Sequence, residues 1–159
     1  MARAEHTVVI GRPADEVFEF LTDFSNVPSW QSGSIDVREP VGPLGVGTTY
    51  VQVLRFLGKR IETTLEVTEF EPGRRFALKA LSGPVPFEVR HTLEPADGQE
   101  ATRLRVELEG EPGGFFKLAD ALVERNAQRQ IERDFSTLKG LVEARGATRT
   151  GEPAEPDTP

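Results

Sequence analysis

The sequence predicts an α+β fold in which a curved antiparallel sheet of about six to seven strands wraps around one long C-terminal helix. Two short helices are expected directly after the first strand. Three observations predict this architecture. Apolar and polar residues alternate with period two through most of residues 34–109, with turn residues at short intervals. Residues 115–145 instead carry apolar side chains at helical spacing. Between the first strand and the alternating region lie two short stretches of helical character.

The N-terminal region predicts one strand followed by two short helices. His6–Ile10 alternates weakly and ends at a glycine, which indicates the first strand. Pro13 and the acidic residues after it are typical of a helix start. The apolar side of this helix is formed by Val17, Phe18, Phe20 and Leu21. Phe24–Trp30 predicts a second element of one or two turns, interrupted near its proline.

The central region predicts a meander of antiparallel hairpins, because each alternating segment is followed by a short turn. The clearest alternation lies in residues 61–67, where one face is apolar and the other carries Glu and Thr. The register of residues 48–57 stays ambiguous, since neither face of that segment is clearly apolar. The six expected strands are 34–39, 48–57, 61–67, 76–80, 87–93 and 102–108.

The C-terminal region predicts a helix from about Phe115 to Arg145, roughly 30 residues and so roughly 45 Å long. Its apolar stripe contains Phe116, Val123, Ala127, Ile131, Phe135, Leu138 and Val142. Gly146 is a plausible end of the helix. Residues 146–159 have almost no apolar side chains and three prolines, so we expect a disordered tail after a single domain of residues 1–145.

Composition excludes several classes of function. The chain of 159 residues has a net charge of −7, which disfavours binding to nucleic acid and to anionic lipid surfaces. The absence of Cys excludes disulfides and thiol chemistry. The two histidines lie far apart with no carboxylates at ligand spacing, so no metal site and no cofactor are expected. With no long apolar segment and no signal-peptide pattern, we expect a cytoplasmic protein without stable membrane insertion.

Several short motifs resemble one known superfamily. They are Ile10-x-x-Pro13-Ala14-Asp15-Glu16-Val17-Phe18, Thr22-Asp23-Phe24-x-x-x-Pro28-x-Trp30, Val46-Gly47-Thr48, Phe70-Glu71-Pro72 and Thr92-Leu93-Glu94-Pro95. Together with the long final helix, they are similar to the START/Bet v 1-like (SRPBCC) superfamily, in particular its bacterial polyketide cyclase/dehydrase branch. The resemblance covers roughly residues 4–145. It implies a helix-grip fold around a deep apolar cavity. Members bind lipids, hormones, sterol-like molecules or polyketides, and some are cyclases or dehydratases.

Three functional hypotheses follow. The first is the binding of an apolar or amphipathic small molecule, lipid or polyketide-like, in an internal cavity, as carrier or sensor. The second is a polyketide cyclase or dehydratase, which would need at least two convergent groups able to move protons. The third is a regulatory protein that binds a partner through an exposed apolar patch. The sequence shows no pair of nucleophile and base, so the first hypothesis is preferred, and the oligomeric state is left open.

Seven residues are candidates for the ligand site: Trp30, Tyr50, Phe87, Val89, His91, Phe116 and Asn126. Alternation places His91 on the inner face of its strand with Phe87 and Val89, where it is a candidate acid or base. Tyr50 is a second catalytic candidate if its strand turns that face inward. The alternatives are structural: a core histidine with one satisfied hydrogen bond, and a tyrosine whose hydroxyl reaches solvent or the backbone.

Overall fold

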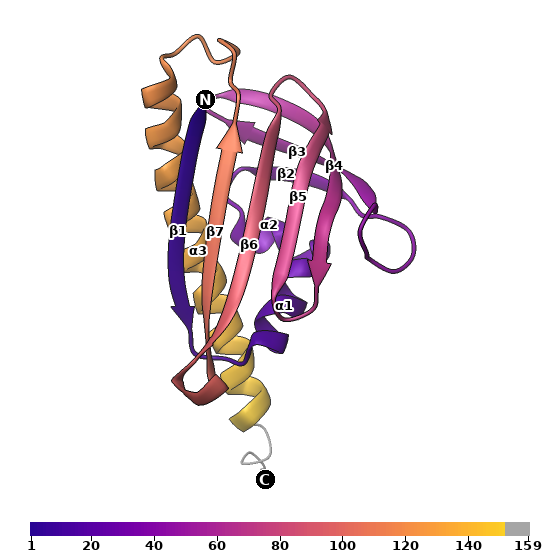
Figure 1. The fold of residues 1–159 in the computed structure, drawn as a ribbon, viewed down its shortest axis with the longest axis vertical. Coiled ribbons are helices and arrows are strands. Elements are labelled where there is room, and N and C mark those ends of the chain that lie inside the picture. Colours follow the sequence, from indigo (N-terminus) through magenta and orange to yellow (C-terminus); the bar gives the residue numbers. More distant parts are fainter. Residues whose placement is uncertain (152–159) are drawn as a thin grey trace.

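The structure, a computed structural model, describes the backbone of residues 1–151 and the side chains of residues 1–146. Within this range, seven antiparallel strands form one curved sheet in the order β1-β7-β6-β5-β4-β3-β2. The sheet curls around the long helix α3, and the short helices, which follow β1 in the chain, lie behind the sheet on the same side as α3 (Figure 1). The predicted helix-grip architecture is therefore confirmed.

The strands extend further than the sequence pattern alone predicted in several places. Irregular pairing between β4 and β5, and between β2 and β3, interrupts the ladder, as is common where a sheet bends strongly. The bounds are β1 (Ala2–Ile10), β2 (Ser34–Arg38), β3 (Thr49–Phe56), β4 (Lys59–Glu71), β5 (Arg75–Ser82), β6 (Phe87–Ala96) and β7 (Ala101–Gly110).

The short helices fill one end of the concave face. They are α1 (Ala14–Thr22), η1 (Phe24–Asn26) and α2 (Val27–Trp30), and a further turn, η2 (Asp97–Gln99), joins β6 to β7. The start of α1 is tied to the sheet, since the Thr102 hydroxyl donates to the Arg12 carbonyl at 2.7 Å. The guanidinium of Arg12 in turn donates two hydrogen bonds to Glu16, each 2.9 Å long.

Helix α3 spans Asp120–Gly151, which differs at both ends from the prediction of Phe115–Arg145. Phe115 and Phe116 belong to the preceding loop, where Gly113, Gly114 and Lys117 have positive φ angles that a helix does not allow. Gly146 does not end the helix. Of the predicted tail 146–159, residues 146–151 continue α3, and residues 152–159 lie outside the described part of the chain.

Helix α3 lies along β1, one edge of the sheet (Figure 1). Alternate residues of an edge strand direct their backbone groups away from the neighbouring strand, where they need other partners. Polar side chains of α3 supply partners for several of these groups. Glu124 accepts from Arg3 N–H (2.8 Å), Gln128 accepts from Glu5 N–H (3.0 Å) and donates to Glu5 O (2.7 Å), Lys139 donates to Val9 O (2.9 Å), and Glu143 accepts from Gly11 N–H (2.7 Å).

The apolar stripe of α3 divides into two halves with different surroundings. Leu138 and Val142, in the C-terminal half, are buried in the main core together with the apolar residues of α1, η1 and α2. The N-terminal half faces a part of the concave sheet that the short helices do not fill. This asymmetry produces the internal cavity described below.

Among the described helices, none is long and apolar enough to cross a membrane.

Shortening Leu138 is expected to destabilise the fold, because its side chain is fully buried between α3 and the sheet. We expect Leu138→Ala to lower the free energy of unfolding by about 3 kcal/mol. Urea denaturation measures the change. Ser136→Ala, at an exposed position of the same helix, is the control and should shift the free energy by less than about 0.5 kcal/mol. Equal effects of the two substitutions would contradict the proposed core position of α3.

Candidate ligand-binding cavity

A cavity of about 230 Å³ lies between the concave face of the sheet and the N-terminal half of α3. Its sheet wall consists mainly of apolar side chains from β3 to β7: Leu54, Phe56, Ile61, Leu65, Leu78, Phe87, Val89, Val106 and Leu108. Alternation along each strand turns these residues to the same face. The sequence pattern of β6 therefore positions Phe87, Val89 and His91 correctly.

The opposite wall comes from α3 and from the segments next to it. Val123, Ala127, Ile131 and Phe135 repeat at helical spacing and face the cavity. Phe116, in the loop before α3, closes one side, where its ring packs against Phe56 with centroids 5.3 Å apart. Trp30, at the end of α2, packs edge-on against Phe135 at 5.0 Å. The indole Nε1 of Trp30 is buried and makes no hydrogen bond to any of the described residues.

A small group of polar side chains interrupts this apolar lining. Gln31, Gln52, Gln130 and Asp134, which we call the polar cluster, line the cavity together with His91. The amide of Gln52 donates to Gln31 at 2.9 Å. The cluster thus joins β3, the segment after α2, and α3 at one place on the cavity wall.

Asp134 is a nearly fully buried carboxylate on α3, with only 5% of its surface exposed. Its Oδ1 accepts hydrogen bonds from the hydroxyl of Ser32 (2.8 Å) and from the backbone N–H of the same residue (3.2 Å). Burial raises the pKa of Asp134, while the bonds from Ser32, the charge of Arg133 and a hydrogen bond from Gln130 oppose the rise. The carboxylate is therefore held in one orientation by the segment after α2.

Gly33 allows this segment to approach α3 closely. A Cβ atom at this position would come within 2.7 Å of the Arg55 carbonyl oxygen and 2.8 Å of the Gln130 amide nitrogen. Real Cβ atoms do not make such contacts, so a larger residue would push the polar cluster apart. The backbone is fixed here as well, because Arg55 N–H donates to the Gly33 carbonyl at 2.7 Å.

His91 lies on the inner face of β6 and is 4% exposed, in agreement with the register expected from its strand. Its Nδ1 is 2.9 Å from the carbonyl oxygen of Phe76. Since a carbonyl only accepts, Nδ1 carries the proton and Nε2 presents a lone pair. Burial lowers the pKa of His91 to about 4, and the bond to Phe76 opposes part of the shift. The ring is neutral near pH 7.

Five of the seven residues proposed from the sequence line the cavity: Trp30, Phe87, Val89, His91 and Phe116. Tyr50 and Asn126 do not. Tyr50 is buried, but it stacks on Phe24 with centroids 4.1 Å apart, and burial raises its pKa, which keeps the hydroxyl protonated. The amide of Asn126 donates to the Leu122 carbonyl of its own helix, on the exposed side of α3.

Sequence reasoning missed Asp134 and Gln31 as cavity residues. Asp134 carries a signal that could have revealed it, because it lies between Ile131 and Leu138 on the buried stripe of α3, where a charged residue is unusual. Gln31 follows Trp30 directly, and nothing in its local pattern distinguishes it. Gln52 lies on the strand whose inward face the sequence left ambiguous, and Gln130 lies beside the apolar stripe of α3.

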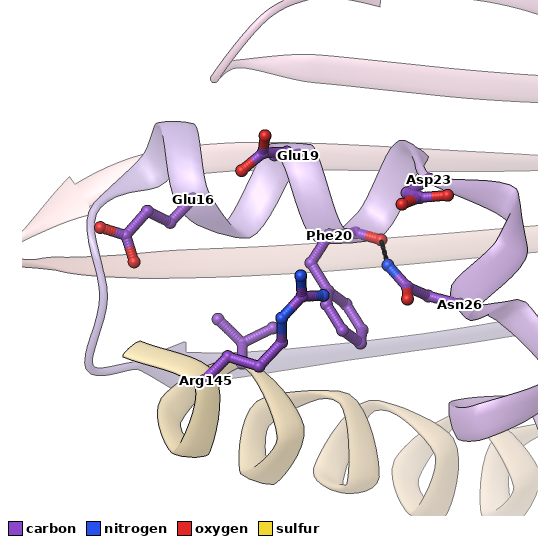
Figure 2. A pocket seen from close by; sticks show the side chains of 7 residues that line it. Glu16, Glu19, Phe20, Asp23, Asn26 and Arg145 are labelled. Atoms are coloured by element: carbon purple, nitrogen blue, oxygen red, sulfur yellow. Dashed lines mark hydrogen bonds between the residues drawn. The ribbon is translucent and has the colours of Figure 1, made fainter. Parts of the chain in front are cut away.

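A second hollow of about 110 Å³ lies between α1 and the C-terminal half of α3. Figure 2 shows that the carboxylates of Glu16, Glu19 and Asp23 point in different directions and do not converge. Arg145 lies over the ring of Phe20, with 5.2 Å between the guanidinium carbon and the ring centroid. This hollow lacks both an apolar interior and convergent polar groups, so the cavity under the sheet is the better candidate site.

Residues 1–143 match the family described as polyketide cyclase / dehydrase and lipid transport, and the chain belongs to this family. The predicted membership of the START/SRPBCC superfamily is thereby confirmed. Among proteins with curated functions, none matches this sequence.

Solved structures show the same fold at low sequence identity. A protein from Thermus thermophilus is 20% identical, with a TM-score of 0.74 over 89% of this chain and 97% of the other. A START superfamily protein from Mycobacterium smegmatis is 18% identical, with a TM-score of 0.74 over 91% and 99%. The Zhui aromatase/cyclase from Streptomyces sp. R1128 is 21% identical, with a TM-score of 0.73 over 91% and 94%.

Acidification is expected to destabilise the protein through His91. Because the folded pKa is about 4 and the ordinary value is 6.5, the unfolded chain binds a proton in this interval that the folded chain does not. The free energy of unfolding therefore falls as the pH drops from 6.5 towards 4, by about 3 kcal/mol from this group. The raised pKa of Asp134 acts in the opposite direction.

The variant His91→Phe lacks the titrating imidazole but keeps Asp134. The difference between wild type and variant in the pH dependence of the free energy of unfolding therefore reports the contribution of His91. Urea denaturation at several pH values between about 7 and 4.5 should give a steeper decline for the wild type than for the variant. Parallel declines would mean that His91 is not held neutral by burial.

Proposed function

We propose that this protein binds an apolar or amphipathic small molecule in the cavity between the sheet and α3, as a carrier or sensor. The observation that carries the proposal is an interior space of about 230 Å³ with mostly apolar walls and a few polar groups gathered at one place. A fold that keeps such a space forgoes the stabilisation that side chains filling it would give. Family membership supports the same class of ligand.

The volume limits the size of the ligand. A cavity of about 150 Å³ is enough for benzene in a well-packed protein. The cavity here is larger by about half, which suits a molecule of one or two rings or a short branched chain. Five aromatic side chains contribute to the walls, namely Trp30, Phe56, Phe87, Phe116 and Phe135, and they favour flat ligands.

Binding of 2-naphthol tests the proposal, because it has two rings and one hydroxyl. We expect saturable binding by calorimetry, with a change in the emission of Trp30, the single tryptophan of the chain. Ala127→Phe places a ring in the cavity from α3 and should weaken binding by roughly tenfold or more. Ala121→Phe, at an exposed position of the same helix, should not.

Circular dichroism checks that both variants remain folded. The proposal fails if 2-naphthol and other one- or two-ring probes do not bind the wild type, or if the two variants weaken binding equally.

The second candidate function is that of a polyketide cyclase or dehydratase. The observation that favours it is the presence of two groups able to exchange protons, His91 and Asp134, on the walls of one cavity. The unprotonated Nε2 of His91 can accept a proton from a carbon next to a carbonyl, which is the first step in eliminating water from a β-hydroxyketone. Tyr50 is a weaker catalytic candidate, because its ring stacks in the core.

Elimination of water from 4-hydroxy-4-(2-naphthyl)butan-2-one tests this second function. The conjugated product absorbs at longer wavelength than the substrate, so the reaction can be followed optically. If the protein is an enzyme of this kind, the rate should exceed the background, and His91→Phe should reduce it by roughly a hundredfold or more while binding persists. A rate that is unchanged in the variant would exclude His91 as the base.

No specific observation favours a regulatory partner. The exposed large apolar residues come from separate segments, among them Val9 of β1, Val41 and Val46 after β2, and Leu118 before α3. Cytoplasmic location and lack of nucleic-acid binding stay predictions from the sequence.

A further inference from the structure

Building on the proposed function, we propose that the cavity selects ligands that carry an O–H or N–H donor, which donates a hydrogen bond to Asp134 or to Nε2 of His91. Both groups accept hydrogen bonds, both line the cavity, and both are held in place by partners that leave an acceptor position open. The class of ligand is therefore a phenol, an alcohol or an amine with an apolar body.

The hydrogen bonds of Asp134 leave one acceptor position available. A carboxylate offers about four lone pairs. Ser32 fills two of these on Oδ1, with its hydroxyl and its backbone N–H, and Gln130 supplies a third hydrogen bond. One acceptor position of this buried carboxylate therefore remains open. Leaving a charged group without this hydrogen bond costs more free energy than leaving a neutral group without a partner.

His91 supplies the second acceptor. Its Nδ1–H donates to Phe76, and its Nε2 makes no hydrogen bond to any of the described residues. The ring packs near Phe135, with centroids 5.8 Å apart, and Phe135 follows Asp134 in the chain. Both acceptors therefore lie on walls of the same cavity.

The cationic and donor groups of the cavity do not favour an anionic ligand. Arg3 is the one cationic side chain on its wall among the described residues, and it is exposed and lies 3.5 Å from Glu109. The Gln52 amide nitrogen already donates to Gln31 at 2.9 Å and to the Ser34 hydroxyl at 3.5 Å. The indole N–H of Trp30 is enclosed by protein atoms. A carboxylate or phosphate ligand would therefore meet Asp134 without a buried cation to offset the repulsion.

Matched probes test the donor requirement near pH 7. Naphthalene has no polar group, 2-methoxynaphthalene only accepts, 2-naphthol donates through O–H, and 2-naphthylmethylamine donates through N–H as an ammonium. We expect 2-naphthol to bind roughly tenfold more tightly than 2-methoxynaphthalene, as measured by calorimetry. The relative affinity of the phenol and the amine shows which donor the site prefers.

Substitutions at the acceptors should remove this preference. His91→Phe should reduce the preference to roughly twofold. Asp134→Asn keeps an oxygen for Ser32 but presents an amide N–H to the ligand, so it should raise the affinity for 2-methoxynaphthalene relative to 2-naphthol. This gain cannot result from a loss of folding. Tyr50→Phe, which removes a hydroxyl elsewhere in the core, should keep the wild-type preference.

The outcomes separate this inference from the proposed function. If no probe binds, including naphthalene, the proposed function itself fails. If the wild type binds all four probes equally and Asp134→Asn changes no ratio, the cavity binds ligands but does not select for a donor, and the inference is overturned.

Discussion

The attachment of α3 along the edge strand β1 is the constraint on which the rest of the structure depends. Side chains of Glu124, Gln128, Lys139 and Glu143 hold the helix to the backbone of β1 and the glycine after it, so α3 cannot move to the centre of the concave face. The curved sheet therefore extends beyond the reach of the helix. At one end, α1 and α2 fill the space with apolar side chains. At the other end no helix or strand of residues 1–151 does, and the cavity results from this difference.

The same constraint explains how charged and polar groups persist in an apolar interior. Because α3 is fixed, Asp134 always meets the segment after α2, where two donors of Ser32 satisfy one of its oxygens. Gly33 permits the close approach of that segment. Burial keeps His91 in its neutral form, and the carbonyl of Phe76, which accepts from Nδ1–H, orients the ring. Each group thus has hydrogen-bond partners that make its burial tolerable.

Local patterns predicted the parts of the molecule that depend on one element at a time. Alternation along β6 placed Phe87, Val89 and His91 on the inner face, because a strand with one apolar face has little freedom of register. The residues of β3 alone did not show which face of the strand points inward. In the structure Tyr50 of this strand stacks on Phe24, a residue distant from it in sequence. The burial of Asp134 could be inferred from its place on the apolar stripe of α3, but its partner Ser32, 102 residues earlier in the chain, could not. The predicted start of α3 lies too early in the chain. Phe115 and Phe116 continue the helical spacing of apolar residues, but the backbone around them is not helical.

The hydrogen bonds between α3 and β1 also bear on self-association. An edge strand with free backbone groups is a template for adding a strand from another molecule, and this route leads to aggregates. On β1 the N–H of Arg3, both backbone groups of Glu5 and the C=O of Val9 already have partners on α3. The opposite edge, β2, is only five residues long, has an irregular register and carries the exposed charges of Asp36 and Arg38. Helix α3 therefore closes the cavity with one face and shields the sheet from strand addition with the adjacent face. A substitution on α3 where these two faces meet would affect both ligand access and self-association.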